Sequence, residues 1–161
     1  MNGTTCYRAP NACTDSQRGD FAHLVRQGFP GAQNLEARIR AAKLLAFYYP
    51  VRDTLRAVAA IKAPDERSRH DLFKLAAAPV DGSDYQLELG WVFVAPAYRG
   101  RQIAEDLCRQ LLVRVPASPL FATTRAGNEP MMRILEALGF ARVGRPFPRR
   151  DNDFLLYLRS H

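Results

Sequence analysis

The sequence has little cysteine, little lysine and no long hydrophobic run. Its three cysteines, Cys6, Cys13 and Cys108, stand at unrelated spacings, which excludes a disulfide framework, and neither they nor the three histidines show the spacing of a metal site. No apolar stretch approaches the roughly 18 residues of a membrane span. The first residues lack the apolar core of a secretory signal. We therefore expect no metal, no membrane association and a reducing, cytoplasmic setting.

Length and composition are those of an ordinary globular protein. The chain has 161 residues, of which 47% are hydrophobic and 24% are charged. Domains commonly contain about 150 residues, and a chain of this size buries enough surface to fold without a metal or disulfide. We expect residues 1–161 to form a single domain.

The net charge of +7 comes from arginine, because 20 of the 23 basic residues are Arg and only 3 are Lys. Arginine suits phosphate recognition, so a nucleotide cofactor or a nucleic acid would both fit the charge. A cluster near the C-terminus, Arg142, Arg145, Arg149 and Arg150, indicates a solvated loop, an anionic acceptor or a nucleic-acid contact. No nucleic-acid-binding motif is visible, and we do not expect such a partner.

The pattern of apolar residues and turn signals predicts an alternation of strands and helices. A short strand at Cys6–Arg8 precedes two helices within Asp15–Arg40, separated at Gly28–Gly31. The runs 43–50 and 55–62 predict a β-hairpin. A connecting segment over 64–84 contains one or two helical turns within 71–78. Strands at 86–94, 120–125, 141–145 and 153–159 are joined by helices from Ile103 to about Val115 and from Asn128 to Gly139, and a Pro- and Arg-rich loop links the last two strands.

This order predicts an α/β (α+β) fold with a mixed sheet flanked by helices. Residues 86–94 form the strongest strand. Leu87, Leu89, Trp91 and Phe93 share one face by alternation, and the other face is also mostly apolar. We therefore expect a central strand.

The segment from Val94 to Ala104 carries the clearest chemistry. A strand ends at Val94, Pro96 follows, and an Arg99-Gly100-Arg101 turn leads into a helix. Backbone amides at a helix N-terminus bind anions, and Gly100 permits close approach of a ligand. An ordinary strand-to-helix loop with exposed arginines could have the same sequence pattern.

These residues resemble the GNAT superfamily of acyl-CoA-dependent N-acyltransferases. The family's phosphate loop, Gln/Arg-x-x-Gly-x-Gly/Ala, is matched by Arg99 to Ala104 after Val94 to Tyr98, and a second signature, an Asn followed by a helix ending in Leu-Gly-Phe, is matched by Asn128 to Phe140. The resemblance covers residues 86–140 best. It implies a mostly antiparallel central sheet that splays at about Val94, with acetyl-CoA entering the splay.

The resemblance also implies roles for individual residues. The loop Arg99, Gly100, Arg101, Gln102, Ile103 and Ala104 would bind the CoA pyrophosphate. Val92, Phe93 and Val94 would pair with the pantetheine arm, and an amide near Val94 would polarise the thioester carbonyl. Asn128 would hydrogen-bond near the pantetheine. Glu88 would accept the proton of the attacking amine, often through water, although a carboxylate at this position could instead pair with an arginine.

Two positions depart from the family pattern. Gln102 stands where glycine is usual, and we expect it in the first helical turn with its side chain pointing away from the loop. Leu135 stands where the family usually has the tyrosine that acts as general acid. Either another group donates that proton, or the sulfur leaves unaided, or the chain binds CoA and catalyses poorly.

The function predicted from these residues is N-acetyl transfer from acetyl-CoA to a primary amine of a small molecule or peptide. Attack would be direct, within a ternary complex. A catalytically weak acyl-CoA-binding sensor module is the first alternative, motivated by Leu135. A basic nucleic-acid-binding protein is the second. Family members often pair through their C-terminal strands, so a homodimer is a further expectation.

Overall fold

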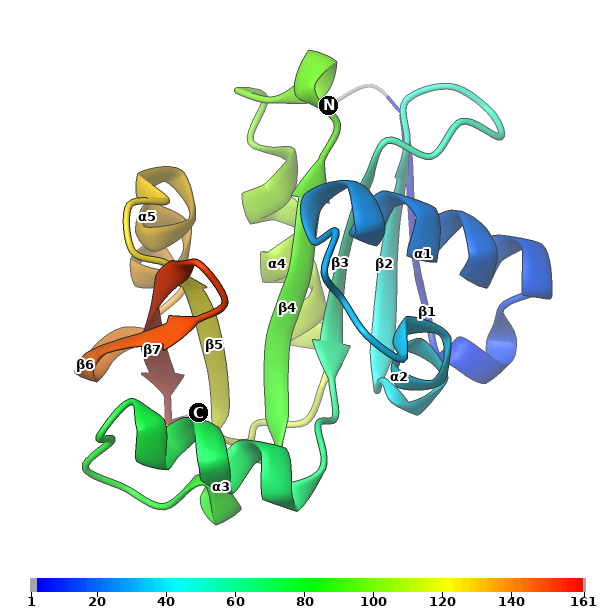
Figure 1. Cartoon of the computed structure of the whole chain (residues 1–161). Helices are drawn as coiled ribbons and strands as arrows, with labels where there is room; N and C mark the ends of the chain where they lie inside the picture. The colour runs from blue at the N-terminus through cyan, green and yellow to red at the C-terminus, as the bar shows by residue number, and fades with distance from the viewer. Residues whose placement is uncertain (1–2, 161) are drawn as a thin grey trace. The chain divides into compact units, whose positions relative to one another are not determined.

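The computed structural model describes residues 3–160 and shows within them a mixed α/β fold (Figure 1). The strands are hydrogen bonded in the order β1-β2-β3-β4-β5-β7-β6, and the sheet is mostly antiparallel. Its strands are β1 Thr4–Arg8, β2 Leu44–Tyr49, β3 Ala57–Lys62, β4 Leu87–Val94, β5 Leu120–Arg125, β6 Ala141–Arg149 and β7 Asn152–Arg159. Its helices are α1 Asp15–Gly28, α2 Leu35–Ala41, α3 Glu66–Leu75, α4 Ile103–Arg114 and α5 Glu129–Ala137. The predicted fold class and the order of the elements are confirmed, as is the central place of β4.

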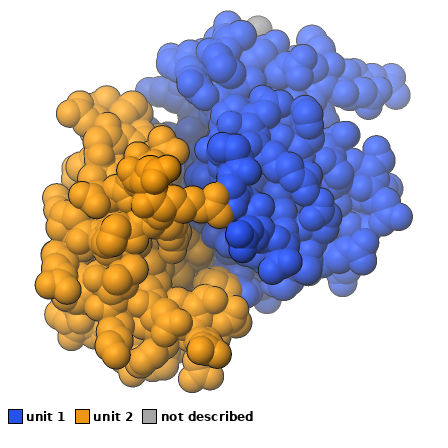
Figure 2. All heavy atoms as spheres, in the orientation of Figure 1, with its two compact units in different colours: residues 1–63, 89–115 blue, residues 64–88, 116–161 orange. Residues whose placement is uncertain are grey.

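The chain divides into two compact units (Figure 2). Unit 1 contains the chain up to Ala63 together with Leu89–Val115, and unit 2 contains Pro64–Glu88 together with the chain from Pro116 onward. The division falls inside β4, whose first two residues, Leu87 and Glu88, pair in parallel with Leu120 and Phe121 of β5. A single domain over residues 1–161 and a splay near Val94 stay predictions.

In unit 1, helices cover both faces of β2 and β3. Alternation along these strands sends Phe47 and Val58 into a core with Phe21 of α1, Leu35 of α2 and Trp91. The other face of β2 and β3 is covered by α4, whose Leu107, Cys108 and Leu111 are fully buried. The helix α1 begins at a capping box in which Thr14 and Gln17 satisfy each other's backbone amides.

Unit 2 has its own core. Phe73 of α3, Phe121 of β5 and Phe147 of β6 pack together with Leu156 and Leu158 of β7. Arg159 of β7 donates from Nε to the carbonyl of Leu138, the C-cap residue of α5, at 2.9 Å. The helix α5 ends as predicted, with Gly139 at a φ of 89° and a buried Phe140 whose amide bonds back to Leu135.

Two elements differ from the sequence-based expectation. The helix α3 begins at Glu66, earlier than expected, because the Asp65 side chain caps it by accepting from the Ser68 amide at 2.7 Å. Pro146 and Pro148, expected in a loop, lie within β6. Prolines are tolerated there because β6 is an edge strand, so an amide facing outward is not needed.

Within residues 3–160, no helix is both long and apolar enough to cross a membrane.

Candidate functional site

The turn from β4 to α4 lies entirely within unit 1, and its own side chains close it. The Arg99 side chain folds back, donating from Nε to the carbonyl of Val94 at 2.9 Å and lying 5.6 Å from the centre of the Phe93 ring. The Arg101 guanidinium lies 5.1 Å from the centre of the Tyr98 ring. Arg99 is therefore committed to holding the turn, whereas Gly100 has a φ of 78° and open space around it.

We expect Gln102 in the first helical turn from the sequence, and the structure shows that this prediction is wrong. Gln102 is the N-cap of α4, with φ 62° and ψ 15°, in the left-handed region where glycine is favoured. The usual glycine of the family pattern is therefore explained by backbone conformation. The expectation failed because a helix-period pattern does not reveal which residue precedes the first helical one.

The N-terminus of α4 keeps its backbone donors available. A side chain caps the first turn of α1, α3 and α5, whereas neither Asn34 in α2 nor Gln102 in α4 makes a capping hydrogen bond. The first bond into the helix runs from the Asp106 amide to the Gln102 carbonyl at 3.1 Å. The amides of Ile103, Ala104 and Glu105 precede it and have no carbonyl partner within the helix. Such amides, with the positive end of the helix dipole, suit a phosphate.

Trp91 gives β4 a conformation that the sequence did not indicate. It has a φ of 51°, so the strict alternation expected along the strand is broken there. The ring is buried, packs edge-on against Phe21 at 6.2 Å, and lies 5.4 Å from the Arg38 guanidinium and 4.8 Å from the Lys62 ammonium. A bulky residue in this region stores backbone strain, which concentrates at functional sites. Gly90 just before it was the one available hint.

The other predicted residues of β4 occupy both units. Val92 and Phe93 are half-buried in unit 1, and Val94 is buried there. The α1 helix approaches Phe93 so closely that a Cβ on Gly28 would lie 2.5 Å from its ring. Glu88 belongs to unit 2, where it is 8% exposed.

Asn128 is the N-cap of α5 in unit 2. Its Oδ1 accepts from the Met131 amide at 3.3 Å, so the cap uses the oxygen of the side chain and not its NH2 group. Leu135, on the same helix, is fully buried and cannot donate a proton. The roles assigned to Asn128 and Glu88 stay predictions.

Sequence reasoning did not single out Tyr157 of β7. Its hydroxyl is buried and has no hydrogen-bond partner among the described residues. Burial first, and then the negative charge of Glu136, raises the pKa of this phenol, so it is protonated at neutral pH.

No cluster of metal-binding side chains occurs in the part of the chain that the structure describes. Burial raises the pKa of the Cys108 thiol to about 12, so this cysteine stays protonated at neutral pH and is a core residue.

A family model described as the acetyltransferase (GNAT) family matches residues 22–140. Among solved structures, the chain is similar to Escherichia coli ElaA, with 15% identity and a TM-score of 0.74 over 98% of this chain and 99% of that one. It is similar to an acyl-CoA N-acyltransferase from Pseudomonas aeruginosa, with 12% identity and a TM-score of 0.73 over 99% and 100%. It is also similar to Arabidopsis thaliana NAA60 in complex with acetyl-CoA, with 17% identity and a TM-score of 0.65 over 98% and 100%. No curated protein matches the chain significantly.

Proposed function

Because the chain belongs to the acetyltransferase (GNAT) family, we propose that it transfers the acetyl group of acetyl-CoA to a primary amine of a small molecule or peptide. The observation that carries the proposal is the turn between β4 and α4. There, two residues with positive φ, Gly100 and Gln102, lead into a helix without a side-chain cap. Successive amides in such a turn form a concave anion site.

The residues of unit 1 fit the phosphates and the arm of this co-substrate. The amides from Arg101 to Ala104 would hold the pyrophosphate, with the open space at Gly100 allowing close approach. Arg101 would add charge beside them. Val92, Phe93 and Val94 would pair with the pantetheine arm in the manner of an added strand. The family resemblance also assigns Asn128, which belongs to unit 2, a hydrogen bond near this arm.

When bound, acetyl-CoA would supply a thioester whose carbonyl carbon a neutral amine attacks directly in a ternary complex. A backbone amide near Val94 would donate to the carbonyl oxygen and stabilise its developing charge. Glu88 would accept the amine's proton through water, which is needed because alkyl amines are mostly protonated at pH 7. With Leu135 at the usual acid position, the sulfur would leave as thiolate, which is reasonable for a thiol with a pKa of about 8.5.

A second candidate is an acyl-CoA-binding module with little or no turnover. The observation that favours it is Leu135, which is fully buried and apolar where related enzymes have a proton donor. The two candidates share the phosphate loop and differ in turnover alone.

The test is calorimetric titration of the full chain with acetyl-CoA, and with desulfo-CoA as a second ligand. We expect one-to-one binding with a micromolar Kd, weakened at least tenfold in Gly100→Glu, since a carboxylate would then face the phosphates. Gly100→Ala is the matched control, because it carries the same backbone strain at a φ of 78° and adds no charge. Arg99→Glu is less informative, because it would break the turn itself.

Turnover is then measured by thiol release across a panel of amines. Acetylation of any amine supports the enzyme, whereas tight binding with no turnover supports the binding module. If wild-type protein fails to bind acetyl-CoA at millimolar concentration, both candidates are wrong.

A further inference from the structure

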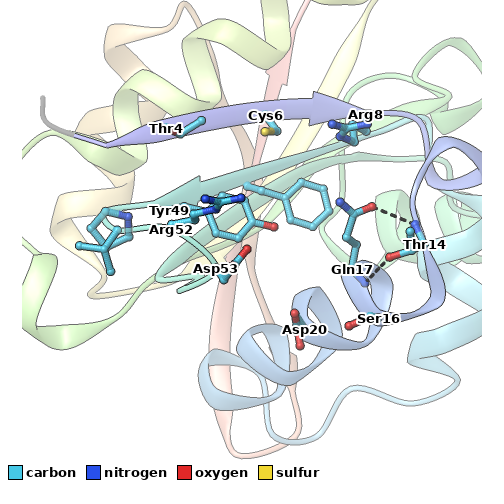
Figure 3. A pocket seen from close by; sticks show the side chains of 13 residues that line it. Thr4, Cys6, Arg8, Thr14, Ser16, Gln17, Asp20, Tyr49, Arg52 and Asp53 are labelled. Carbon is cyan, nitrogen blue, oxygen red and sulfur yellow. Dashed lines mark hydrogen bonds between the residues drawn. The ribbon is translucent and has the colours of Figure 1, made fainter.

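Unit 1 contains a hollow away from the β4–α4 turn. It has a volume of about 700 Å³ and lies between β1, the N-terminal half of α1 and the turn that joins β2 to β3. In Figure 3, Cys6 and Arg8 come from β1, Asp20 comes from α1, and Arg52 and Asp53 come from the hairpin turn. The volume is that of a small-molecule site.

The floor of the hollow is aromatic. The Phe47 and Tyr49 rings are stacked, with centroids 6.4 Å apart and an angle of 10° between the planes. Phe47 is buried and Tyr49 is half-buried, so the Tyr49 ring offers a surface to a ligand. Burial first, and then the nearby Cys6 and Asp20, raises the pKa of the Tyr49 hydroxyl, which is therefore a donor at neutral pH. The floor can accept an apolar side chain and still donate a hydrogen bond.

The walls carry two positive and two negative charges that do not pair. Arg8 and Arg52 are exposed, as are Asp20 and Asp53. None of the four makes an ion pair or side-chain hydrogen bond with another described residue. Elsewhere in unit 1, arginine and carboxylate do pair, as Arg26 with Glu36 and Arg109 with Glu105. Here unlike charges line one hollow without forming an ion pair among the described residues.

Local structure sets the backbone positions of Asp53 and Asp20. Asp53 has a φ of 62° in the hairpin turn, which an isolated bridge between Val51 and Thr54 closes. Asp20 is one turn beyond the capping box that starts α1. Asp20 and Arg8 line the hollow together with Tyr49, and they shift the pKa of the Tyr49 hydroxyl in opposite directions.

We propose that this hollow binds a small zwitterion of amino-acid chemistry, with its ammonium toward Asp20 and Asp53, its carboxylate toward Arg8 and Arg52, and an apolar side chain against Tyr49. A simple amine would meet uncompensated arginines, and a simple anion would meet uncompensated aspartates. A zwitterion satisfies both signs at once, and charge-assisted hydrogen bonds are the stronger kind. The proposal concerns a site apart from acetyl transfer and does not depend on it.

The first experiment titrates the full chain calorimetrically with L-phenylalanine, phenylalanine amide and N-acetylphenylalanine. The amide lacks the carboxylate and the N-acetyl compound lacks the ammonium. We expect one-to-one binding of phenylalanine and at least tenfold weaker binding of each derivative. Equal binding of the three compounds, or no binding of phenylalanine at millimolar concentration, would overturn the proposal.

Charge variants assign the two ends of the ligand. Asp20→Asn should lower the affinity for phenylalanine at least tenfold and leave the affinity for N-acetylphenylalanine unchanged. Arg8→Gln should also lower the affinity for phenylalanine at least tenfold, but it should leave the affinity for phenylalanine amide unchanged. Asp71→Asn on α3 and Arg40→Gln on α2 are matched controls, since both residues are exposed and neither lines the hollow. An equal loss of phenylalanine affinity in the control variants would mean that the net charge of the protein causes the effect, and it would overturn the assignment.

Cys6 reports where the ligand binds. It lines the hollow and is half-buried, whereas Cys13 and Cys108 are buried. Bound phenylalanine should slow the alkylation of Cys6 by iodoacetamide at least threefold, as read by peptide mass spectrometry. Calorimetric binding that leaves this rate unchanged places the ligand elsewhere and overturns the proposal. Because Gly100→Glu should leave phenylalanine binding intact, failure of this site and failure of acetyl-CoA binding are distinguishable.

Discussion

Gly144 is the residue whose backbone leaves the least choice of side chain. It lies where the register of β6 shifts between Val143 and Phe147, with a φ of 68°. A Cβ there would stand 2.1 Å from the Ala76 carbonyl oxygen, which accepts from the Arg145 amide at 2.8 Å. The bulge in β6 is thereby attached to the C-terminal end of α3.

Gly144→Ala should therefore destabilise the protein strongly. The left-handed conformation costs an alanine about 1 kcal/mol, and forcing apart the strand and the helix end adds about 1–3 kcal/mol. Gly127→Ala is the matched control, because Gly127 also has a positive φ, 112°, but nothing lies within 4 Å of its Cβ position. Urea denaturation should show a clearly larger loss for Gly144→Ala. Equal losses of unfolding free energy in the two variants would mean that the Ala76 carbonyl can move away from the added Cβ without an energetic cost.

At the scale of the element, the start of α4 depends on one strained residue. Gln102→Gly relieves a left-handed cost of about 1 kcal/mol and adds chain entropy of about 0.5–1 kcal/mol to the unfolded state, so the two effects nearly cancel. Gln102→Val cannot relieve the strain, because β-branched residues tolerate positive φ poorly. We expect the Gln102→Gly variant to have the unfolding free energy and the acetyl-CoA affinity of the wild-type protein. The Gln102→Val variant should have an unfolding free energy lower by about 1–2 kcal/mol. The opposite order, measured by urea denaturation and calorimetry, would contradict a backbone role.

Elements with clear periodicity could be predicted from the sequence, and those set by single side chains could not. The β2–β3 hairpin, α4 and the Asn128-capped α5 follow from apolar spacing and punctuation. The early start of α3 depends on the Asp65 cap, and the full length of β6 depends on its place at a sheet edge. Neither fact is visible in periodicity.

The candidate site divides in the same way. The loop from Arg99 to Ala104 could be found from its motif, because glycine and arginine before a helix are a local signal. The positive φ of Trp91 could not be predicted, because no local motif marks it and its ring contacts, Phe21, Arg38 and Lys62, come from distant parts of the chain. The hollow lined by β1, α1 and the β2–β3 turn could not be predicted either, because these segments come together only after folding.

At the scale of the whole molecule, the charge of +7 should attract an anionic co-substrate. The Debye length falls from about 30 Å at 0.01 M salt to about 8 Å at 0.15 M, so long-range attraction is mostly lost over that range. The KM for acetyl-CoA, or its Kd if turnover is absent, should rise several-fold, whereas kcat at saturation should not change. Arg101→Gln should weaken this salt dependence more than Arg40→Gln, because Arg101 lies in the phosphate loop and Arg40 on α2. A KM that is insensitive to salt would mean that the arginines serve solubility, and that recognition depends on the neutral amides at the start of α4.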